Sequence, residues 1–133
     1  YRQQSIWNLK ASGKRKVMND QEEVIDPAKH SKEKFLKFIL RFSAIPGLSR
    51  HHWGTDIDIF DSSKMEKSQL KLIASEYETD GPCSELSQWL NENIQSQSSF
   101  GFFKPYAIDL GGIAVEQWHI SYSPLSSFFY EQY

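Results

Sequence analysis

Cysteine is almost absent from this 133-residue sequence, which contains Cys83 alone. A single cysteine excludes an internal disulfide and an all-cysteine zinc site, and we expect Cys83 to be buried or inert. No apolar run approaches the roughly 20 residues that a membrane-spanning helix needs, so we expect no membrane span. The net charge is −2. Because no stripe of lysine and arginine with interleaved aromatic residues occurs either, nucleic acid is not expected as the main partner.

Aromatic residues, by contrast, are plentiful: nine Phe, six Tyr and four Trp make up 14% of the chain. This is not the composition of a disordered protein, and the length suffices for one domain with a real core. We find no internal repeat or linker, so we expect a single domain over residues 1–133. The first residue is Tyr1 and no signal peptide follows it, so we expect a domain trimmed at its N-terminus, with any export signal upstream.

Apolar residues at helical spacing predict four helical segments. Residues 3–10 predict a short helix with Ile6 and Leu9 on one side. Ser31 is the expected N-cap of a second helix that ends before Pro46-Gly47. A third helix is predicted over residues 84–96, and residues 125–133 predict a short helix or a packed cap. The expected inward-facing residues are Phe35, Phe38, Ile39 and Phe42 in the second helix, and Leu86, Trp89, Leu90 and Ile94 in the third.

Alternating, β-rich segments predict strands between these helices. Residues 55–60 predict a strand with Ile57 and Ile59 on the buried face, which places Asp56 and Asp58 together on the opposite face. Residues 113–122 predict another strand, residues 70–73 a short one, and residues 100–103 a strand or a packed loop. Residues 11–30 and 61–68 are expected to be loops, with turns at residues 80–82 and 109–112.

Two short segments concentrate side chains that bind metal ions. Residues 49–58 read Ser-Arg-His-His-Trp-Gly-Thr-Asp-Ile-Asp, and residues 116–119 read Glu-Gln-Trp-His. Catalytic zinc takes three protein ligands and keeps one position open. His51 and Asp58 could reach one ion if the chain turns tightly at Gly54, which has no Cβ to clash. His119 is then a candidate third ligand and Glu116 a candidate base.

Spacing alone leaves two questions about these segments open. Asp56 and Asp58 share a strand face, so periodicity does not choose between them. Glu116 and His119 are three residues apart, and in a flat strand they would point to opposite faces. Both could face one ion only if the chain bends or bulges there.

The joint pattern Ser49-x-His51-x-x-Gly54-x-x-x-Asp58, followed by Glu116-x-Trp118-His119, resembles the signature of VanY-type D-alanyl-D-alanine carboxypeptidases. These zinc peptidases share a fold with lysostaphin-type enzymes and the hedgehog signalling domain. Further segments are similar to the family at residues 2–8, 44–47, 89–90, 101–102 and 105–106, so the similarity spans most of the chain. The resemblance implies an α+β fold in which a small antiparallel sheet carries the zinc site and helices flank it.

The resemblance also implies a role for each matching residue. His51, Asp58 and His119 would be the ligands of Zn²⁺, and Glu116 the catalytic base. Ser49 and Gln3 match positions that help hold the substrate, and Trp118 matches a position beside the site.

The implied activity is a zinc-dependent carboxypeptidase that removes the terminal D-alanine from peptidoglycan stem peptides. It would act as a monomer in the periplasm or cell envelope. An L,D-carboxypeptidase or a D,D-endopeptidase would use the same ligands, and a non-catalytic peptide-binding module on the same fold is a further alternative.

The sequence departs from the family pattern at two places. The family usually has a small residue where this chain has Asp56; we interpret Asp56 as a solvated or salt-bridged carboxylate, with a contact behind the metal ligands as the alternative. The family arginine, expected five residues before the position of Gln3, would precede Tyr1. Either it was removed with the N-terminus, or another residue such as Arg41 or Arg50 replaces it; Arg2 is a stand-in at the wrong spacing. His52, next to a ligand, is expected to point elsewhere.

Overall fold

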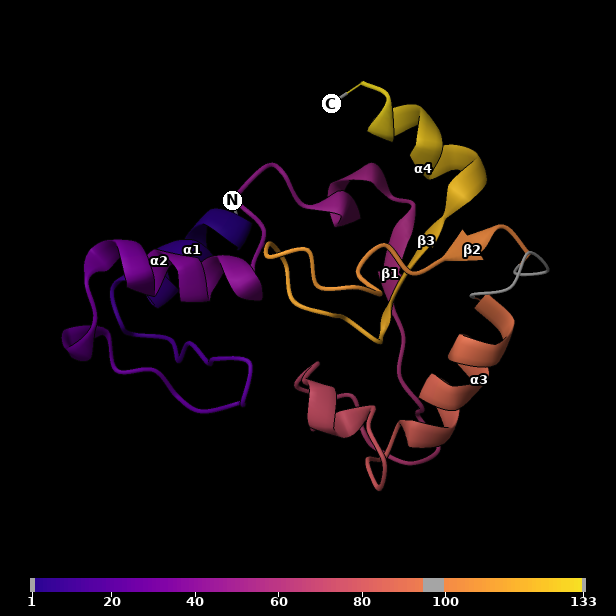
Figure 1. Ribbon diagram of the computed structural model, residues 1–133, viewed down its shortest axis with the longest axis horizontal. Helices are drawn as coiled ribbons and strands as arrows, with labels where there is room; N and C mark the ends of the chain where they lie inside the picture. Colours follow the sequence, from indigo (N-terminus) through magenta and orange to yellow (C-terminus); the bar gives the residue numbers. More distant parts are fainter. Residues whose placement is uncertain (1, 95–99, 133) are drawn as a thin grey trace. The chain divides into compact units, whose positions relative to one another are not determined.

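A three-stranded antiparallel sheet, in the order β1-β3-β2, lies at the centre of the C-terminal part of the fold (Figure 1). The computed structural model describes residues 2–94 and 100–132. The strands are β1 (Asp56–Asp58), β2 (Phe102–Phe103) and β3 (His119–Tyr122). The helices are α1 (Arg2–Ala11), α2 (Lys32–Arg41), α3 (Ser84–Ile94) and α4 (Ser123–Tyr130), with short 3-10 helices η1 (Pro27–Lys29), η2 (Arg50–Trp53) and η3 (Ala74–Glu76). This combination confirms the predicted α+β class. Within the described ranges, no helix is long and apolar enough to cross a bilayer.

The chain divides into two compact units. The first comprises Tyr1–Ser49 and Ile108–Ala114, and the second comprises Arg50–Ala107 and Val115–Tyr133. The first unit contains α1, η1 and α2, and the second contains the sheet with α3 and α4. We expected a single domain over residues 1–133. That the two units together form one domain stays a prediction.

The first unit is built around the apolar face of α2. Ser31 caps this helix as predicted, because its hydroxyl accepts a hydrogen bond from the Lys34 N–H at 3.2 Å. Phe35 and Ile39, four residues apart, are buried and pack against Val17. Val17 comes from the predicted loop, residues 11–30, where its carbonyl accepts a hydrogen bond from the Ile25 N–H at 2.8 Å. A polar loop thus completes the core of this unit.

In the second unit, α3 packs against β3. The buried residues of α3 are Ser87, Leu90 and Ile94, and the two apolar ones pack on Ile120 of β3. The prediction that Trp89 faces inward is wrong, since it is 51% exposed. Successive helical residues are rotated by about 100°, which turns Trp89 away from the stripe that Leu90 and Ile94 share. Of the predicted helix over 84–96, residues 95 and 96 lie outside the described residues.

Strand β1 is shorter than predicted, and its one buried residue is Asp56 rather than Ile57. Ile57 is 49% exposed, whereas Asp56 is only 5% exposed, so the prediction of a buried Ile57 is wrong. The strand lies at the edge of the sheet, and polar partners on the opposite face bury Asp56. Ile59, which follows the strand, packs partly against the core as expected.

No strand forms at residues 70–73, and that prediction is wrong. The carboxylate of Glu76 accepts hydrogen bonds from the N–H groups of Lys71, Leu72 and Ile73, so a side chain satisfies the donors that a neighbouring strand would otherwise bind. Leu72 also has a φ of 57°, outside the β region. Next to this turn, the Tyr77 hydroxyl donates to the Ile59 carbonyl at 2.8 Å.

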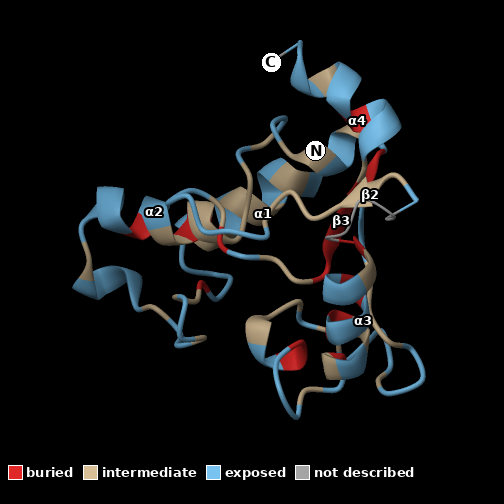
Figure 2. Ribbon diagram, turned by 45° about the vertical axis from the view of Figure 1, so that its right-hand side comes forward, coloured by how far each residue is buried: buried red, intermediate tan, exposed pale blue. Residues whose placement is uncertain are grey.

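Strand β3 begins at His119, six residues later than predicted. Gln117 and Trp118 form a turn, and before it the Glu116 N–H donates to the Tyr106 carbonyl at 3.1 Å, so the chain before this turn bonds to a loop rather than to a strand. The first three residues of β3 are buried, and Figure 2 shows this strand in the buried colour. Strand β2 and helix α4 confirm the strand option at residues 100–103 and the helix option for the tail, whose last residue is not described.

Candidate metal centre

The register between β1 and β3 brings the two metal-binding segments of the sequence together. Asp56 lies opposite Ser121, and Asp58 lies opposite His119. Because side chains alternate along a strand, all four occupy one face of the sheet, while Ile57 and Ile120 occupy the other.

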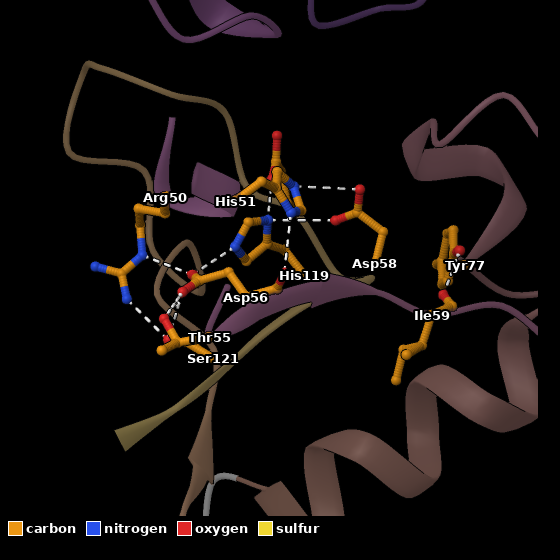
Figure 3. Close-up of polar contacts among 10 residues, drawn as sticks. Arg50, His51, Thr55, Asp56, Asp58, Ile59, Tyr77, His119 and Ser121 are labelled. Carbon is orange, nitrogen blue, oxygen red and sulfur yellow. Dashed lines mark hydrogen bonds and ion pairs between the residues drawn. The ribbon is translucent and has the colours of Figure 1, made fainter. Parts of the chain in front are cut away.

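Three side chains on this face form a cluster that could hold a metal ion. His51, Asp58 and His119 each offer one ligand atom, and these atoms lie within 4.8 Å of one another. Asp58 is central: its Oδ2 lies 3.4 Å from His51 Nε2, and its Oδ1 lies 3.3 Å from His119 Nδ1 (Figure 3). His51 comes from η2, and Gly54, with a φ of +72°, makes the turn between η2 and β1. The turn expected at this glycine is therefore present.

Glu116 lies beside the same cluster. Its Oε2 is 3.1 Å from His119 Nδ1, and its side chain is 15% exposed. Because Glu116 precedes the strand and a turn separates it from His119, strand alternation does not apply to this pair. The bend that the spacing required is the turn at residues 117–118.

Hydrogen bonds fix the orientation of both imidazoles. His51 Nδ1 lies 3.1 Å from the Asp56 carbonyl oxygen. A carbonyl only accepts, so Nδ1 carries a hydrogen, and Nε2 is the nitrogen that faces Asp58. His119 Nε2 lies 2.8 Å from Asp56 Oδ1, which turns Nδ1 toward Asp58 and Glu116. The two tautomers are assigned from these hydrogen-bond partners.

Asp56 is buried within a network of donors. Arg50 Nε donates to its Oδ1 at 2.7 Å, while the hydroxyls of Thr55 and Ser121 donate to its Oδ2 at 2.7 and 3.0 Å. Burial raises the pKa of Asp56, but the hydrogen bonds from Thr55, His119 and Arg50 outweigh it and lower the pKa. The salt-bridged interpretation of Asp56 is confirmed and the solvated one is wrong. The contact behind the ligands, offered as the alternative, is also present.

The electrostatics of the cluster favour positive charge. Burial lowers the pKa of His119, but the adjacent carboxylates of Asp58, Glu116 and Asp56 outweigh this and raise it to about 10. A hydrogen bond to Asp58 raises the pKa of His51. Burial raises the pKa of Asp58, yet the two imidazoles beside its carboxylate lower it overall.

These observations test whether a metal ion fits. His119 Nδ1 is buried and makes no hydrogen bond of acceptable geometry, although two carboxylates lie near it. The described ion pairs of the cluster contain three carboxylates but only one guanidinium, that of Arg50, which offsets one of the three negative charges. With neutral imidazoles, the remaining charge matches a divalent cation. Two imidazole nitrogens and one carboxylate are a donor set typical of zinc, so the residues fit Zn²⁺.

Trp118 lies in the core of the second unit. It is 4% exposed and packs with Tyr77 and Cys83. Its place beside the substrate stays a prediction. Cys83 is fully buried, as expected, and His52 is exposed.

Gln3 and Ser49 both belong to the first unit. The Gln3 side chain donates to the Ala44 carbonyl at 3.2 Å and accepts from the Gly47 N–H at 3.3 Å, which ties α1 to the segment after α2. Ser49 is half-buried. Their contacts with substrate stay predictions.

The two arginines considered as replacements for the family arginine both bind carboxylates. Arg41 forms ion pairs with Asp20 and Asp109 at 3.0 and 2.7 Å. Arg50 binds Asp56, and its guanidinium lies 4.4 Å above the Trp53 ring. A substrate carboxylate would have to compete with these partners.

The sequence did not indicate the joint role of Arg50, Thr55 and Ser121 around Asp56. One signal was available: Asp56-x-Asp58 and His119-x-Ser121 both place two polar residues on one strand face. Only the pairing of the two strands shows that these faces coincide.

Comparisons with known proteins test the family resemblance. A family model described as VanY, D-alanyl-D-alanine carboxypeptidase, matches residues 1–125. An uncharacterized protein of Haemophilus influenzae is 41% identical over 92 residues, which cover 67% of this chain and 68% of that protein. The family resemblance seen in the motifs is thus confirmed.

Two solved structures share the fold. VanYB in complex with D-Alanine-D-Alanine has a TM-score of 0.55 and 22% identity, and the match covers 98% of this chain and 59% of that one. A mutant of the vancomycin resistance D,D-pentapeptidase VanY from a VanB-type resistance cassette, in complex with Zn(II), has a TM-score of 0.55 and 21% identity, and the match covers 98% and 60%. This chain therefore spans about three fifths of the length of the two solved chains.

Proposed function

Because the chain belongs to the VanY family of D-alanyl-D-alanine carboxypeptidases, we propose that it is a zinc-dependent peptidase. It removes the terminal D-alanine from peptidoglycan stem peptides and acts as a monomer in the periplasm or cell envelope. The observation that carries the proposal is the cluster of His51, Asp58 and His119, with Glu116 beside it. Solved relatives in complex with D-Alanine-D-Alanine and with Zn(II) support the substrate and the metal.

The metal would be held by His51 Nε2, His119 Nδ1 and the Asp58 carboxylate. A zinc ion held there would supply a Lewis acid for the scissile carbonyl and would lower the pKa of a coordinated water to about 7. Asp58 offsets part of the charge of the ion, and the second-unit fold supplies all three ligands. Three protein ligands leave one coordination position for chemistry.

Glu116 is the proposed general base and then general acid. Its Oε2 would take a proton from the attacking water and pass it to the leaving amine of D-alanine. The backbone of Glu116 is fixed by its bond to the Tyr106 carbonyl, and the Tyr106 ring meets the His119 ring edge-on at 5.0 Å. The base is thus held at a defined distance from a ligand, as proton transfer requires.

The test measures zinc content and turnover together in wild type and Glu116→Ala. We expect wild type to bind zinc and to release D-alanine from a muramyl-type pentapeptide. The variant should keep its zinc and lose about 10²–10⁴-fold in rate, the usual contribution of a positioned base. Glu92→Ala, an exposed glutamate on α3, is the matched control and should retain full activity.

Different results would contradict separate parts of the proposal. Loss of zinc from Glu116→Ala would make Glu116 a ligand rather than the base. Cleavage of tetrapeptide or cross-linked substrates in place of the pentapeptide would indicate an L,D-carboxypeptidase or an endopeptidase. Peptide binding without any product would indicate a binding module.

A further inference from the structure

Asp56 contacts both histidines of the proposed metal centre without being one of its ligands. Its Oδ1 lies 2.8 Å from His119 Nε2, and its backbone carbonyl lies 3.1 Å from His51 Nδ1 (Figure 3). We propose that Asp56 is a positioning residue that decides which nitrogen each histidine presents to the metal: Nδ1 of His119 and Nε2 of His51. This inference rests on the proposed zinc function and adds a residue to it.

The network around Asp56 explains why it positions a ligand rather than acting as one. A carboxylate offers about four acceptor positions. Those of Asp56 are occupied by the donors of Arg50, Thr55, Ser121 and His119. Rotation of the side chain toward the metal would break several of these bonds in a buried site, where unpaired donors are costly. Asp56 is therefore held against the far nitrogen of His119.

The sheet register gives the two aspartates of β1 their different roles. Asp58 lies directly opposite His119 and faces its Nδ1, whereas Asp56 lies two pairs further along and faces its Nε2. The His119 ring therefore lies between two carboxylates, one near each of its nitrogens. A ring flip that exchanged its nitrogens would leave the Nε2 hydrogen without Asp56 as acceptor.

The contact with His51 uses the backbone of Asp56 and follows from the turn at Gly54. That turn returns the chain from η2 so that the Asp56 carbonyl meets His51 Nδ1. The side chain of Asp56 fixes one histidine, and its carbonyl fixes the other. A substitution at position 56 should therefore disturb His119 far more than His51.

The first experiment compares zinc affinities of the full chain by competition with a chromophoric chelator. Asp56→Asn keeps the shape of the side chain but turns an NH₂ group toward donors. We expect zinc to bind 10–100-fold more weakly, the usual effect of losing a partner behind a ligand. Asp61→Asn is the matched control: it removes the same charge in the same unit, and the Asp61 side chain bonds to Ser63. Its zinc affinity should equal that of wild type.

The second experiment needs no variant, so it holds even if Asp56→Asn fails to fold. Long-range ¹H–¹⁵N NMR spectra of the zinc-loaded wild type distinguish the two imidazole nitrogens. We expect His119 to show a protonated Nε2 and a metal-bound Nδ1, and His51 the reverse. A metal-bound Nε2 in His119 would overturn the inference.

The outcomes separate the two proposals. Wild type that binds zinc, with unchanged affinity in folded Asp56→Asn, would refute the positioning role and leave the zinc site intact. Wild type that binds no zinc would refute the proposed function, and the inference would fall with it.

Discussion

Substitution of Glu76 tests whether a single side chain holds the segment that was expected to be a strand. Glu76 is 7% exposed. Its carboxylate accepts hydrogen bonds from the N–H groups of Lys71 at 3.0 Å, Leu72 at 2.8 Å and Ile73 at 3.4 Å. Glu76→Ala removes all three acceptor contacts at once.

The expected cost follows from the surroundings of these donors. Lys71 is exposed, so water can bind its N–H group, whereas Leu72 and Ile73 are half-buried. Two half-buried donors that lose their partner cost about 1.5 kcal/mol each, so Glu76→Ala should lower the free energy of unfolding by about 3 kcal/mol. Glu76→Gln can keep an oxygen toward Leu72 and Ile73 and should cost only about 1 kcal/mol.

Urea unfolding, followed by tryptophan fluorescence in the presence of a chelator, measures both variants. The midpoint should shift while the slope stays constant. Glu78→Ala, an exposed glutamate two residues further on, is the control and should stay within about 0.5 kcal/mol of wild type. If Glu76→Ala costs less than about 1 kcal/mol, or if Gln costs as much as Ala, the carboxylate does not hold this turn in the way described.

Two further predictions concern a glycine and an ion pair. A Cβ on Gly81 would lie 2.6 Å from the carbonyl atoms of Glu76, whereas one on Gly112 would meet nothing within 4 Å; Gly81→Ala should therefore lower the thermal unfolding temperature by several degrees more than Gly112→Ala, and equal effects would contradict the packing. Hydrogen bonds from Arg41 lower the pKa of Asp109 from 3.8 to about 2, so this pair stabilises the fold fully above about pH 4 and loses its effect as pH falls toward about 2. The difference in unfolding temperature between wild type and Asp109→Asn should shrink over that range, and a constant difference would refute the role of the ion pair.

The helices were predictable because their signals are local. Ser31 caps α2 through its own hydroxyl, and the spacing of Phe35 and Ile39 places both in the core. Neither feature depends on distant parts of the chain. The prediction for Trp89 was wrong because an apolar residue next to the buried stripe of a helix can still be exposed, and the spacing alone does not show where the stripe ends.

The strands were less predictable because their partners are distant. The apolar residues at 70–73 match a strand pattern, but the Glu76 carboxylate binds backbone N–H groups that a neighbouring strand would have needed. Likewise, the extent of β3 depends on two distant partners, since β1 pairs with only three of its residues and β2 pairs with Tyr122. The alternation of polar and apolar residues within one segment does not show which distant segment or side chain will bind its backbone groups.

The candidate site was predictable in its members but not in its internal order. Spacing alone left Asp56 and Asp58 equivalent, and the family resemblance selected Asp58. The structure shows why both are acidic: they contact different nitrogens of one imidazole. That distinction depends on a cross-strand register, which a single sequence does not display.

Alternate residues of the short strand β3 face two different environments. Its odd positions, His119 and Ser121, belong to the polar face, and Ile120 between them belongs to the core beneath α3. A slip of one residue would exchange these faces, placing an isoleucine against the carboxylates and an imidazole among leucines. Insertion or deletion of one residue between the turn at 117–118 and Tyr122 should therefore abolish folding and metal binding together, whereas substitutions there can separate the two.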